Sequence, residues 1–327
     1  MRITWNEPAA RAAPADPMRF ASLWVPRRGP VLCTVREGAL FPIGRGHPLA
    51  DVSELLASTR PSRPPSLEAA AELLGQDPMA IARWDEVEGA DPDESRPHLL
   101  APVRPVEVWA AGVTYERSLT ARKLESHEPD IYERVYTAAR PELFLKATGP
   151  RVIGPNGRMG LRSDSAWQVP EPECALVLGA AGVVFGYTLG NDLSSRDIEG
   201  ENPLYLPQAK CFAGSCAIGP MVVSTSELGD PYHLELAVRV VRDGRLAFGE
   251  QTSTARLHVR LETLIEHLRR DNWMAPGTVL LTGTGIVPPD GFTLASGDLV
   301  EISSPAIGVL RNQCVPAGEL RPPPGWD

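Results

Sequence analysis

The sequence has few cysteines, no histidine pattern for a metal and no long apolar run, and each absence excludes a class of protein. Its five cysteines are odd in number and lack CxxC spacing, which favours reduced thiols over disulfides or a zinc site. The least polar run, Ala175 to Gly190, is interrupted by glycines and is shorter than the ~20 residues of a membrane helix. The N-terminus lacks the apolar segment of a secretory signal. We therefore expect a soluble, cytoplasmic protein.

Positive charge is also scarce. The chain carries 41 acidic against 32 basic residues, a net charge of -9, which argues against nucleic acid or an anionic membrane as the main partner. An acidic small substrate would then need a local cation or a metal. The glycine-rich stretches GAAGVVFG and LTGTGI lack the strand-to-helix context of a dinucleotide site and the lysine of a P-loop, so we interpret them as turns.

The length of 327 residues is enough for a large core, and no internal repeat is visible. We expect a small N-terminal domain, residues 1–100, and a catalytic domain, residues 101–327. In the first, residues 18–43 alternate as short strands, and Arg60 to Ser66 forms a loop whose last residue caps a short helix. The polar, acidic segment from Glu86 to Arg96 leads to the boundary.

The second part has mostly strand-like segments. Val106 to Tyr115, Pro141 to Ala147 and His233 to Val241 are typical strands, and Asp243-Gly244 after the last of them predicts a hairpin turn. Helical leucine spacing occurs from Ser253 to Asn272. The charged segment from Glu116 to Tyr136 predicts a helix or a mobile lid. The expected fold class is therefore mostly β with a few helices, an α+β protein.

Two glutamates stand at the start of an apolar run in VPEPECALVLG. Glu171 and Glu173 share one face of an extended segment because strand side chains alternate. The next strand ends in Asp192, so three carboxylates can meet at one rim. Their repulsion calls for a cation, and a set of oxygen ligands without histidine suits Mg²⁺ or Mn²⁺ better than Zn²⁺. The alternative is an E-x-E pair on a solvent-facing edge, which is common and carries no function.

An ordered set of motifs adds to these observations: the E-x-E with its apolar run, then YTLGNDLSSRD, then AKCFAGSCAIGP. Together, over about residues 106–315, they resemble the fumarylacetoacetate hydrolase superfamily. The resemblance implies a mixed β-sandwich or roll as the catalytic domain. It also implies that Glu171, Glu173 and Asp192 bind the metal and that Lys210 is the active-site lysine. Arg196 and Thr284 fall where relatives contact substrate.

One departure points to a branch of this superfamily. Its hydrolases carry a histidine and a glutamate that activate water, where this chain has Ser118 and Ala121 in GVTYERSLTARK. That stretch, PELFLK and GENPLYLPQAK are most similar to 2-keto-3-deoxy-pentonate dehydratases. The resemblance implies an Mg-dependent hydro-lyase that converts a 2-keto acid derived from D-arabinonate, D-xylonate or L-arabinonate into 2,5-dioxopentanoate. It also implies a homo-oligomer, a dimer or a tetramer, and a role for Glu142 in proton transfer.

Several assignments stay open at this point. We assign Glu142 as the base at C3, and Lys210 as the acid for the C4 hydroxyl or as an orienting group. Lys146 either binds substrate or forms an ion pair, and Arg196 either binds substrate or pairs with Asp197. Glu199 and Glu201 are expected in a solvated loop. The rival functions are an acylpyruvate hydrolase, an oxaloacetate decarboxylase, and a keto-acid-binding protein without catalysis.

Overall fold

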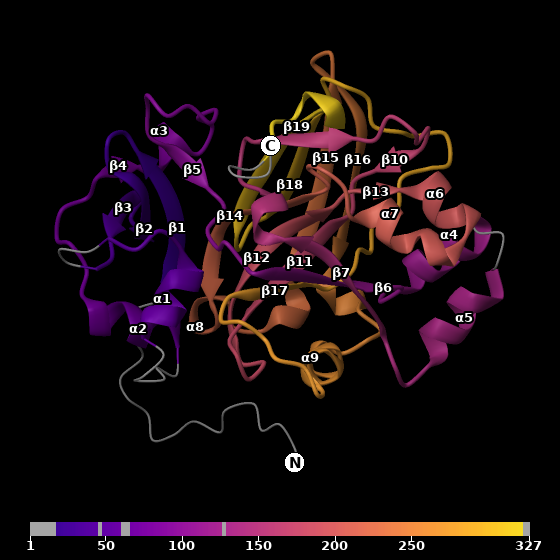
Figure 1. Ribbon diagram of the computed structural model, residues 1–327, viewed down its shortest axis with the longest axis horizontal. Helices are drawn as coiled ribbons and strands as arrows, with labels where there is room; N and C mark the ends of the chain where they lie inside the picture. The colour runs from indigo at the N-terminus through magenta and orange to yellow at the C-terminus, as the bar shows by residue number, and fades with distance from the viewer. Residues whose placement is uncertain (1–17, 45–47, 60–65, 126–128, 323–327) are drawn as a thin grey trace.

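The computed structural model describes residues 18–44, 48–59, 66–125 and 129–322, and two mixed sheets dominate it (Figure 1). The N-terminal stretch judged to lack a signal and residues 60–65 of the expected loop lie outside the described residues. The expectation of a mostly β, α+β protein is confirmed. Among the described residues, no helix is long and apolar enough to span a bilayer.

The larger sheet runs in the order β4-β3-β2-β1-β14-β12-β11-β17-β6-β7, with β5 beside β1 and β8 beside β14. In that order its strands are Ala82–Arg83, Ala39–Pro42, Gly29–Arg36, Arg19–Val25, Cys216–Ser224, Val184–Asp192, Pro172–Leu178, Thr278–Leu281, Glu107–Gly112 and Glu142–Thr148, then His98–Leu100 (β5) and Val152–Ile153 (β8). The strands expected within residues 18–43, 106–115 and 141–147 are all present here.

The second sheet has the order β16-β15-β18-β19-β9, and a short pair, β10-β13, lies apart. These strands are Arg245–Ser253, Glu235–Arg242, Leu299–Ser304, Gly308–Pro316 and Arg158–Leu161, then Gln168–Val169 (β10) and Ser194–Ser195 (β13). The turn between β15 and β16 has positive φ at Asp243 (50°) and Gly244 (72°), as the Asp-Gly dipeptide predicts.

Short helices fill the connections. They are α1 Val52–Ser58, α2 Leu67–Leu74, α3 Trp84–Val87, α4 Glu116–Glu125, α5 Pro129–Thr137, α6 Arg196–Glu201, α7 Leu206–Lys210, α8 Thr225–Leu228 and α9 Leu261–Arg269, with 3-10 turns at Gly149–Arg151, Pro203–Tyr205, Pro231–His233, Thr254–Arg256 and Ala317–Glu319. Ser66 caps α2, since its hydroxyl accepts the amide of Ala69. The segment expected as a helix or lid forms two helices, α4 and α5.

The helix expected from Ser253 to Asn272 is wrong in its first half, because only Leu261–Arg269 is α-helical. Thr254 donates its amide to Leu234, and His258 donates its amide to Thr114. Leu257 forms a β-bridge with Tyr115. These long-range backbone bonds replace the local bonds of a helix, so the leucine spacing did not predict where the helix begins.

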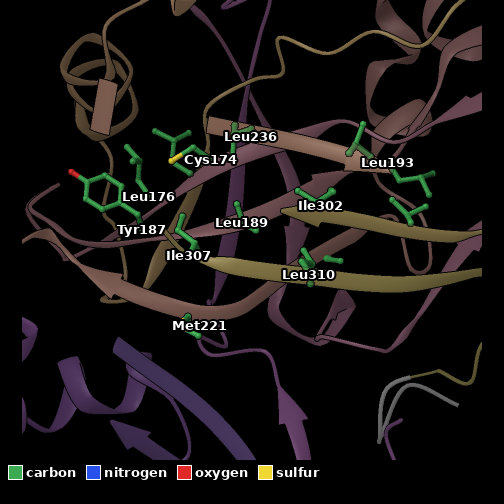
Figure 2. Packing of buried hydrophobic residues seen from close by; sticks show 14 of the residues in the cluster. Cys174, Leu176, Tyr187, Leu189, Leu193, Met221, Leu236, Ile302, Ile307 and Leu310 are labelled. Carbon is green, nitrogen blue, oxygen red and sulfur yellow. The ribbon is translucent and has the colours of Figure 1, made fainter. Parts of the chain in front are cut away.

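Alternation along β11 divides the core into two clusters. Cys174 and Leu176 face the second sheet and pack with Leu236 of β15 and Ile302 of β18, as Figure 2 shows. Ala175 and Val177 face the other way, into a cluster that also contains residues of β1, α1 and α2. Glu171 and Glu173 belong to this second face by the same alternation, so the charged site lies beside a buried apolar cluster.

Residues on both sides of the expected boundary at 100 share one sheet. β1 pairs antiparallel with β14, where Arg19 lies opposite Val223 and Phe20 opposite Val222. In Figure 1 the indigo N-terminal strands extend the sheet sideways from β14. The N-terminal part therefore completes an edge of the larger sheet.

Candidate active site

Three carboxylates meet where β11 begins and β12 ends. The two strands are antiparallel, with Glu173 opposite Gly190, and Asp192 donates its amide to the carbonyl of Glu171 over 3.0 Å. Residues that face each other in such a pair point to the same side of the sheet. Glu171, Glu173 and Asp192 therefore converge, and one oxygen from each lies within 4.8 Å of the others.

Three cations surround this triad. Lys210, the last residue of α7, donates from Nζ to Glu171 Oε2 (2.9 Å), to Asp192 Oδ2 (3.2 Å) and to Ser194 Oγ (2.6 Å). Arg196, the first residue of α6, donates to Glu171 Oε1 over 2.9 Å. Its other terminal nitrogen donates to Glu125 Oε2 of α4 over 2.7 Å. Arg196 thereby connects α4, α6 and the residue that precedes β11.

Lys146 is the third cation and lies fully buried. Its ammonium is 2.6 Å from Asp192 Oδ1 and donates to the carbonyls of Leu193 (2.9 Å) and Lys210 (2.6 Å). The pairing of β6 with β7 shifts register here, since Trp109 faces Leu145 whereas Val108 faces Ala147. Lys146 is the extra residue of this β-bulge. It lies on the same side of β7 as Phe144 and Glu142, two and four residues earlier, and its side chain reaches the triad.

Of the three carboxylates of the triad, Glu173 has the fewest partners in the described part of the chain that offset its negative charge. Oε2 accepts the amide of Gly283 over 2.5 Å, while Oε1 is buried and has no hydrogen-bond partner among the described residues. Burial, together with the charges of Asp192 and Glu171, raises the pKa of Glu173. Gly283 can approach this closely because it adopts φ +89°, and a Cβ there would lie 1.9 Å from Thr114 Oγ1.

The donor set fits a hard divalent cation. All the candidate ligand atoms are carboxylate oxygens, which Mg²⁺ and Mn²⁺ prefer. The unpartnered Oε1 of Glu173 is a buried acceptor that a metal would satisfy. In addition, ion pairs join the other two carboxylates of the triad and Glu125 to the three cations. Glu173 forms no such ion pair among the described residues, so a divalent ion would offset its negative charge.

A cavity opens beside the triad. Its wall is formed by the end of β6, the start of β7, α4, α6, α7 and the loop after β17, and it is lined by Ala111, Gly112, Val113, Ser118, Glu142, Phe144, Glu171, Asp192, Glu199, Lys210 and Thr284. Glu142 faces Gly112 across the β6–β7 pair. A Cβ on Gly112 would lie 2.2 Å from Glu142 Oε2, so the glutamate lies flat over the bare glycine. Glu142, Lys210 and two triad members therefore share one cavity.

The three residues expected to bind substrate occupy different places. Thr284 lines the cavity, and its Oγ1 accepts the amide of Ile286 over 3.2 Å. Arg196 and Lys146 lie behind the triad, with their charged groups directed at protein oxygens. The pairing of Arg196 with Asp197 does not occur, because Asp197 accepts hydrogen bonds from Ser165 and from the amide of Ala166.

Sequence reasoning missed two side chains of this site. Glu199 was expected in a solvated loop, but α6 buries it and directs it to the cavity; Glu201 on the same helix is exposed, as expected. Ser194, whose hydroxyl oxygen accepts a hydrogen bond from Lys210, was not predicted as a site residue. The signal for Glu199 was its position three residues after Arg196, on the same side of a helical turn.

The two positions that carry the water-activating pair in hydrolases serve the fold here. Ser118 donates its hydroxyl to the carbonyl of Tyr115 over 2.7 Å and accepts that residue's amide, which closes the first turn of α4. Ala121 is buried in the same helix. Neither side chain can act as a general base on water.

The fold and the cavity define a β-rich protein with a buried, oxygen-lined site for a divalent cation. A family model described as "Fumarylacetoacetate (FAA) hydrolase C-terminal" matches residues 112–315. The chain belongs to the fumarylacetoacetate hydrolase family, and the resemblance noted from its motifs is confirmed.

Two curated relatives are similar over about two thirds of the chain. The "Probable 2-keto-3-deoxyxylonate dehydratase" of Haloferax volcanii is 47% identical over 215 residues, 66% of this chain and 74% of that protein. The "2-dehydro-3-deoxy-D-arabinonate dehydratase" of Saccharolobus solfataricus is 45% identical over 219 residues, 65% of this chain and 72% of that protein.

A solved structure is similar over nearly the whole chain. It is described as "2-keto-3-deoxy-D-arabinonate dehydratase complexed with magnesium and 2,5-dioxopentanoate" and has a TM-score of 0.77 at 33% sequence identity. The match covers 91% of this chain and 98% of that one. The match is therefore wider than that of the family model, which covers residues 112–315.

Proposed function

We propose that this protein is an Mg-dependent hydro-lyase that dehydrates a 2-keto-3-deoxy-pentonate to 2,5-dioxopentanoate. The observation that carries the proposal is the cavity in which Glu142 and Lys210 adjoin the carboxylate triad, with Ser118 and Ala121 in place of a water-activating pair. The two curated relatives and the solved structure support it, because their names state this reaction and the solved complex contains magnesium and that product.

The triad would hold the metal. Glu171, Glu173 and Asp192 supply the oxygen ligands, and a bound Mg²⁺ or Mn²⁺ supplies a Lewis acid that polarises the keto group and acidifies the C3–H bond. The protein's own part is to fix these ligands. Lys146 does so for Asp192 and Arg196 for Glu171, so we assign both as positioning residues.

Glu142 is the residue we assign to proton transfer at C3. It lines the cavity from β7 with its carboxylate held over Gly112. In the proposed reaction Glu142 takes one C3 proton, the C4–O bond breaks and the hydroxyl leaves as water with the proton of an acid. This gives 5-hydroxy-2-oxopent-3-enoate. A proton shift from C5 to C3 then gives the C4–C5 enol, and transfer of the enol hydroxyl proton to C4 gives 2,5-dioxopentanoate without further change in composition.

Lys210 is assigned to the carboxylate end of the substrate. Its ammonium touches Glu171, Asp192 and Ser194, and therefore lies at the metal end of the cavity. A cation there binds and orients the C1 carboxylate of a 2-keto acid. This favours the orienting role for Lys210. The C4 hydroxyl is then protonated by a different acid, at the Glu142 end of the cavity.

The assay for this function compares products. The protein with Mg²⁺ is incubated with both C4 epimers of 2-keto-3-deoxy-pentonate and, separately, with acylpyruvates and oxaloacetate. We expect 2,5-dioxopentanoate, detected as an aldehyde by NMR. Release of pyruvate from an acylpyruvate, or carbon dioxide from oxaloacetate, as the main activity would contradict the proposal, and binding without any turnover would favour a non-catalytic protein.

Two variants separate the assigned roles. Glu142→Gln should lower kcat by about 10²-fold or more, since a positioned base contributes roughly this much. Lys210→Met should mainly raise KM, because it removes the cation that holds C1. Full turnover in Glu142→Gln together with loss of kcat in Lys210→Met would reverse the assignment.

The remaining part of the proposal concerns assembly and location. We propose a homo-oligomer, a dimer or a tetramer, and a cytoplasmic location. Reduced, buried cysteines support the second point: Cys33, Cys174, Cys216 and Cys314 are buried and unpaired with one another. Light scattering coupled to gel filtration measures the first, and a monomer at micromolar concentration would contradict it.

A further inference from the structure

Arg196 joins the candidate metal site to a helix that forms part of the cavity wall. Its two terminal nitrogens donate to different carboxylates, one to Glu171 Oε1 over 2.9 Å and the other to Glu125 Oε2 over 2.7 Å. Glu125 is the last residue of α4, and Ser118 in the first turn of that helix lines the cavity. In Figure 1, α4 lies beside α6, the helix that begins with Arg196. A metal ligand and a cavity helix therefore share one guanidinium group.

This connection is rigid and buried. The guanidinium is planar, so a shift of one carboxylate turns the whole group and moves its contact with the other. The side chains of Arg196 and Glu125 are 1% and 5% exposed, and water therefore screens their charges only weakly. A change at Glu125 alters both the position of Arg196 and the charge that it presents to Glu171.

We propose that Glu125 is a positioning residue of the metal site, which acts through Arg196 on Glu171 and links the binding of Mg²⁺ to the packing of α4 against α6. The proposal rests on the proposed function in one respect, namely that the triad binds the metal. It adds to that function a residue from α4, a helix that supplies none of the three ligands.

The direction of the effect follows from the charges around Glu171. Two cations, Arg196 and Lys210, already bind its carboxylate oxygens, and a divalent ion adds positive charge beside them. Like charges repel strongly in a buried site. When Glu171 is shared with the metal, the carboxylate of Glu125 becomes the more important counter-charge for Arg196. The pair between Glu125 and Arg196 is therefore stronger in the metal-bound protein, and its loss should weaken metal binding.

Coupling of this kind is reciprocal. If Glu125 increases the affinity for Mg²⁺ by some factor, bound Mg²⁺ stabilises the packed position of α4 by the same factor. Residues that orient metal ligands commonly contribute about tenfold or more to metal affinity, so we expect about tenfold in each direction.

Calorimetric titration with Mg²⁺ alone is the first test. Glu125→Gln keeps the shape of the side chain and removes its charge, and the Kd of Mg²⁺ should rise by about tenfold. Glu133→Gln of α5 is the matched control: it makes the same chemical change and breaks an exposed ion pair, 2.7 Å long, with Lys123 of α4. The Kd should be unchanged in this control, because the lost pair holds α4 to α5 and not to Arg196.

A second titration tests the route through Arg196. Arg196→Lys keeps the charge but offers one nitrogen in place of two, so it cannot hold both carboxylates in the same geometry. In that background Glu125→Gln should raise the Kd by less than about threefold, since the two changes remove one shared interaction. A tenfold rise in both backgrounds would show that Glu125 acts independently of Arg196 and would overturn the inference.

Hydrogen exchange of the unchanged protein needs no variant, so it decides the matter even if a substituted chain fails to fold. Saturating Mg²⁺ should slow exchange in the last turn of α4 by about tenfold, and Glu125→Gln should lose this response. Exchange in α4 that is the same with and without bound metal overturns the inference. So does an equal Kd in Glu125→Gln and the unchanged protein, whereas a protein that binds no Mg²⁺ contradicts the proposed metal site itself and this inference with it.

Discussion

At the scale of single residues, chemistry at the site depends on where each carboxylate lies. Strand alternation predicted that Glu171 and Glu173 share a face, and the register of β11 with β12 confirms it and brings Asp192, the third predicted carboxylate, beside them. Partners far apart in sequence were not predictable. Arg196 contacts Glu125, 71 residues earlier, and alternation carries no information about such a pair.

Glu173 offers the sharpest test of metal binding. Mg²⁺ should raise the melting temperature of the protein, since a ligand at 100 times its Kd stabilises the native state by about 2.7 kcal/mol. Glu173→Gln removes one ligand and should abolish most of that shift. Differential scanning calorimetry with and without Mg²⁺ measures it, with Glu201→Gln as control. An equal shift in Glu173→Gln and the unchanged protein would show that the metal binds elsewhere.

Gly112 tests whether the position of Glu142 matters. The Cβ of Gly112→Ala would lie 2.2 Å from Glu142 Oε2, so the carboxylate has to move away. We expect kcat to fall by up to about 100-fold, the size of effect that a displacement of about 1 Å produces. The Mg²⁺-dependent shift in melting temperature should persist. Gly89→Ala, where an added Cβ meets nothing within 4 Å, is the matched control. Unchanged kcat in Gly112→Ala would count against Glu142 as the base.

At the scale of elements, periodicity predicted which segments are strands but not their irregularities. β7 was expected from Pro141 to Ala147 and is present, yet the bulge at Lys146 leaves no mark in the sequence pattern. The leucine stripe failed for a related reason, since residues 254–258 make long-range backbone bonds. The unpredicted bulge and the wrong helix start both occur where tertiary contacts decide local structure.

The buried ion pair between Lys146 and Asp192 leads to a prediction about stability. Lys146→Met removes the ammonium 2.6 Å from Asp192 Oδ1, and among the described residues this leaves the buried carboxylate with Lys210 as its one remaining cation. The free energy of unfolding should fall by about 3 kcal/mol, at the lower end for a broken buried pair. Urea denaturation without metal measures it. A loss of less than about 1 kcal/mol, as for an exposed pair, would show that Lys146 contributes little.

At the scale of the whole molecule, the question is whether the part before residue 100 is separable. The change in composition near residue 100 predicted a domain boundary. Composition alone could not show that β1 belongs to the same sheet as the strands of the site. In the structure Phe20 and Leu32 pack in one cluster with Ile218 and Val222 of β14. β14 in turn pairs with β12, the strand that ends in Asp192.

This arrangement predicts the behaviour of a fragment. A chain of residues 101–327 lacks β1, so the edge of β14 that pairs with β1 is left unpaired. The apolar side chains of the same cluster on β14 are then exposed. An unpaired edge next to exposed apolar surface promotes association between chains. We expect the fragment to aggregate or to unfold without a cooperative transition, whereas the full chain unfolds in one step.

Calorimetry and near-ultraviolet circular dichroism of both proteins decide the matter. The response to Mg²⁺ reports whether the site is formed, because a fragment that still folds around the triad should be stabilised by the metal as the full chain is. A soluble fragment with a cooperative transition and that metal response would establish the N-terminal residues as an independent domain. Loss of both would mean that β1 and its neighbours hold β14 and β12 in place, and with them the carboxylate of Asp192.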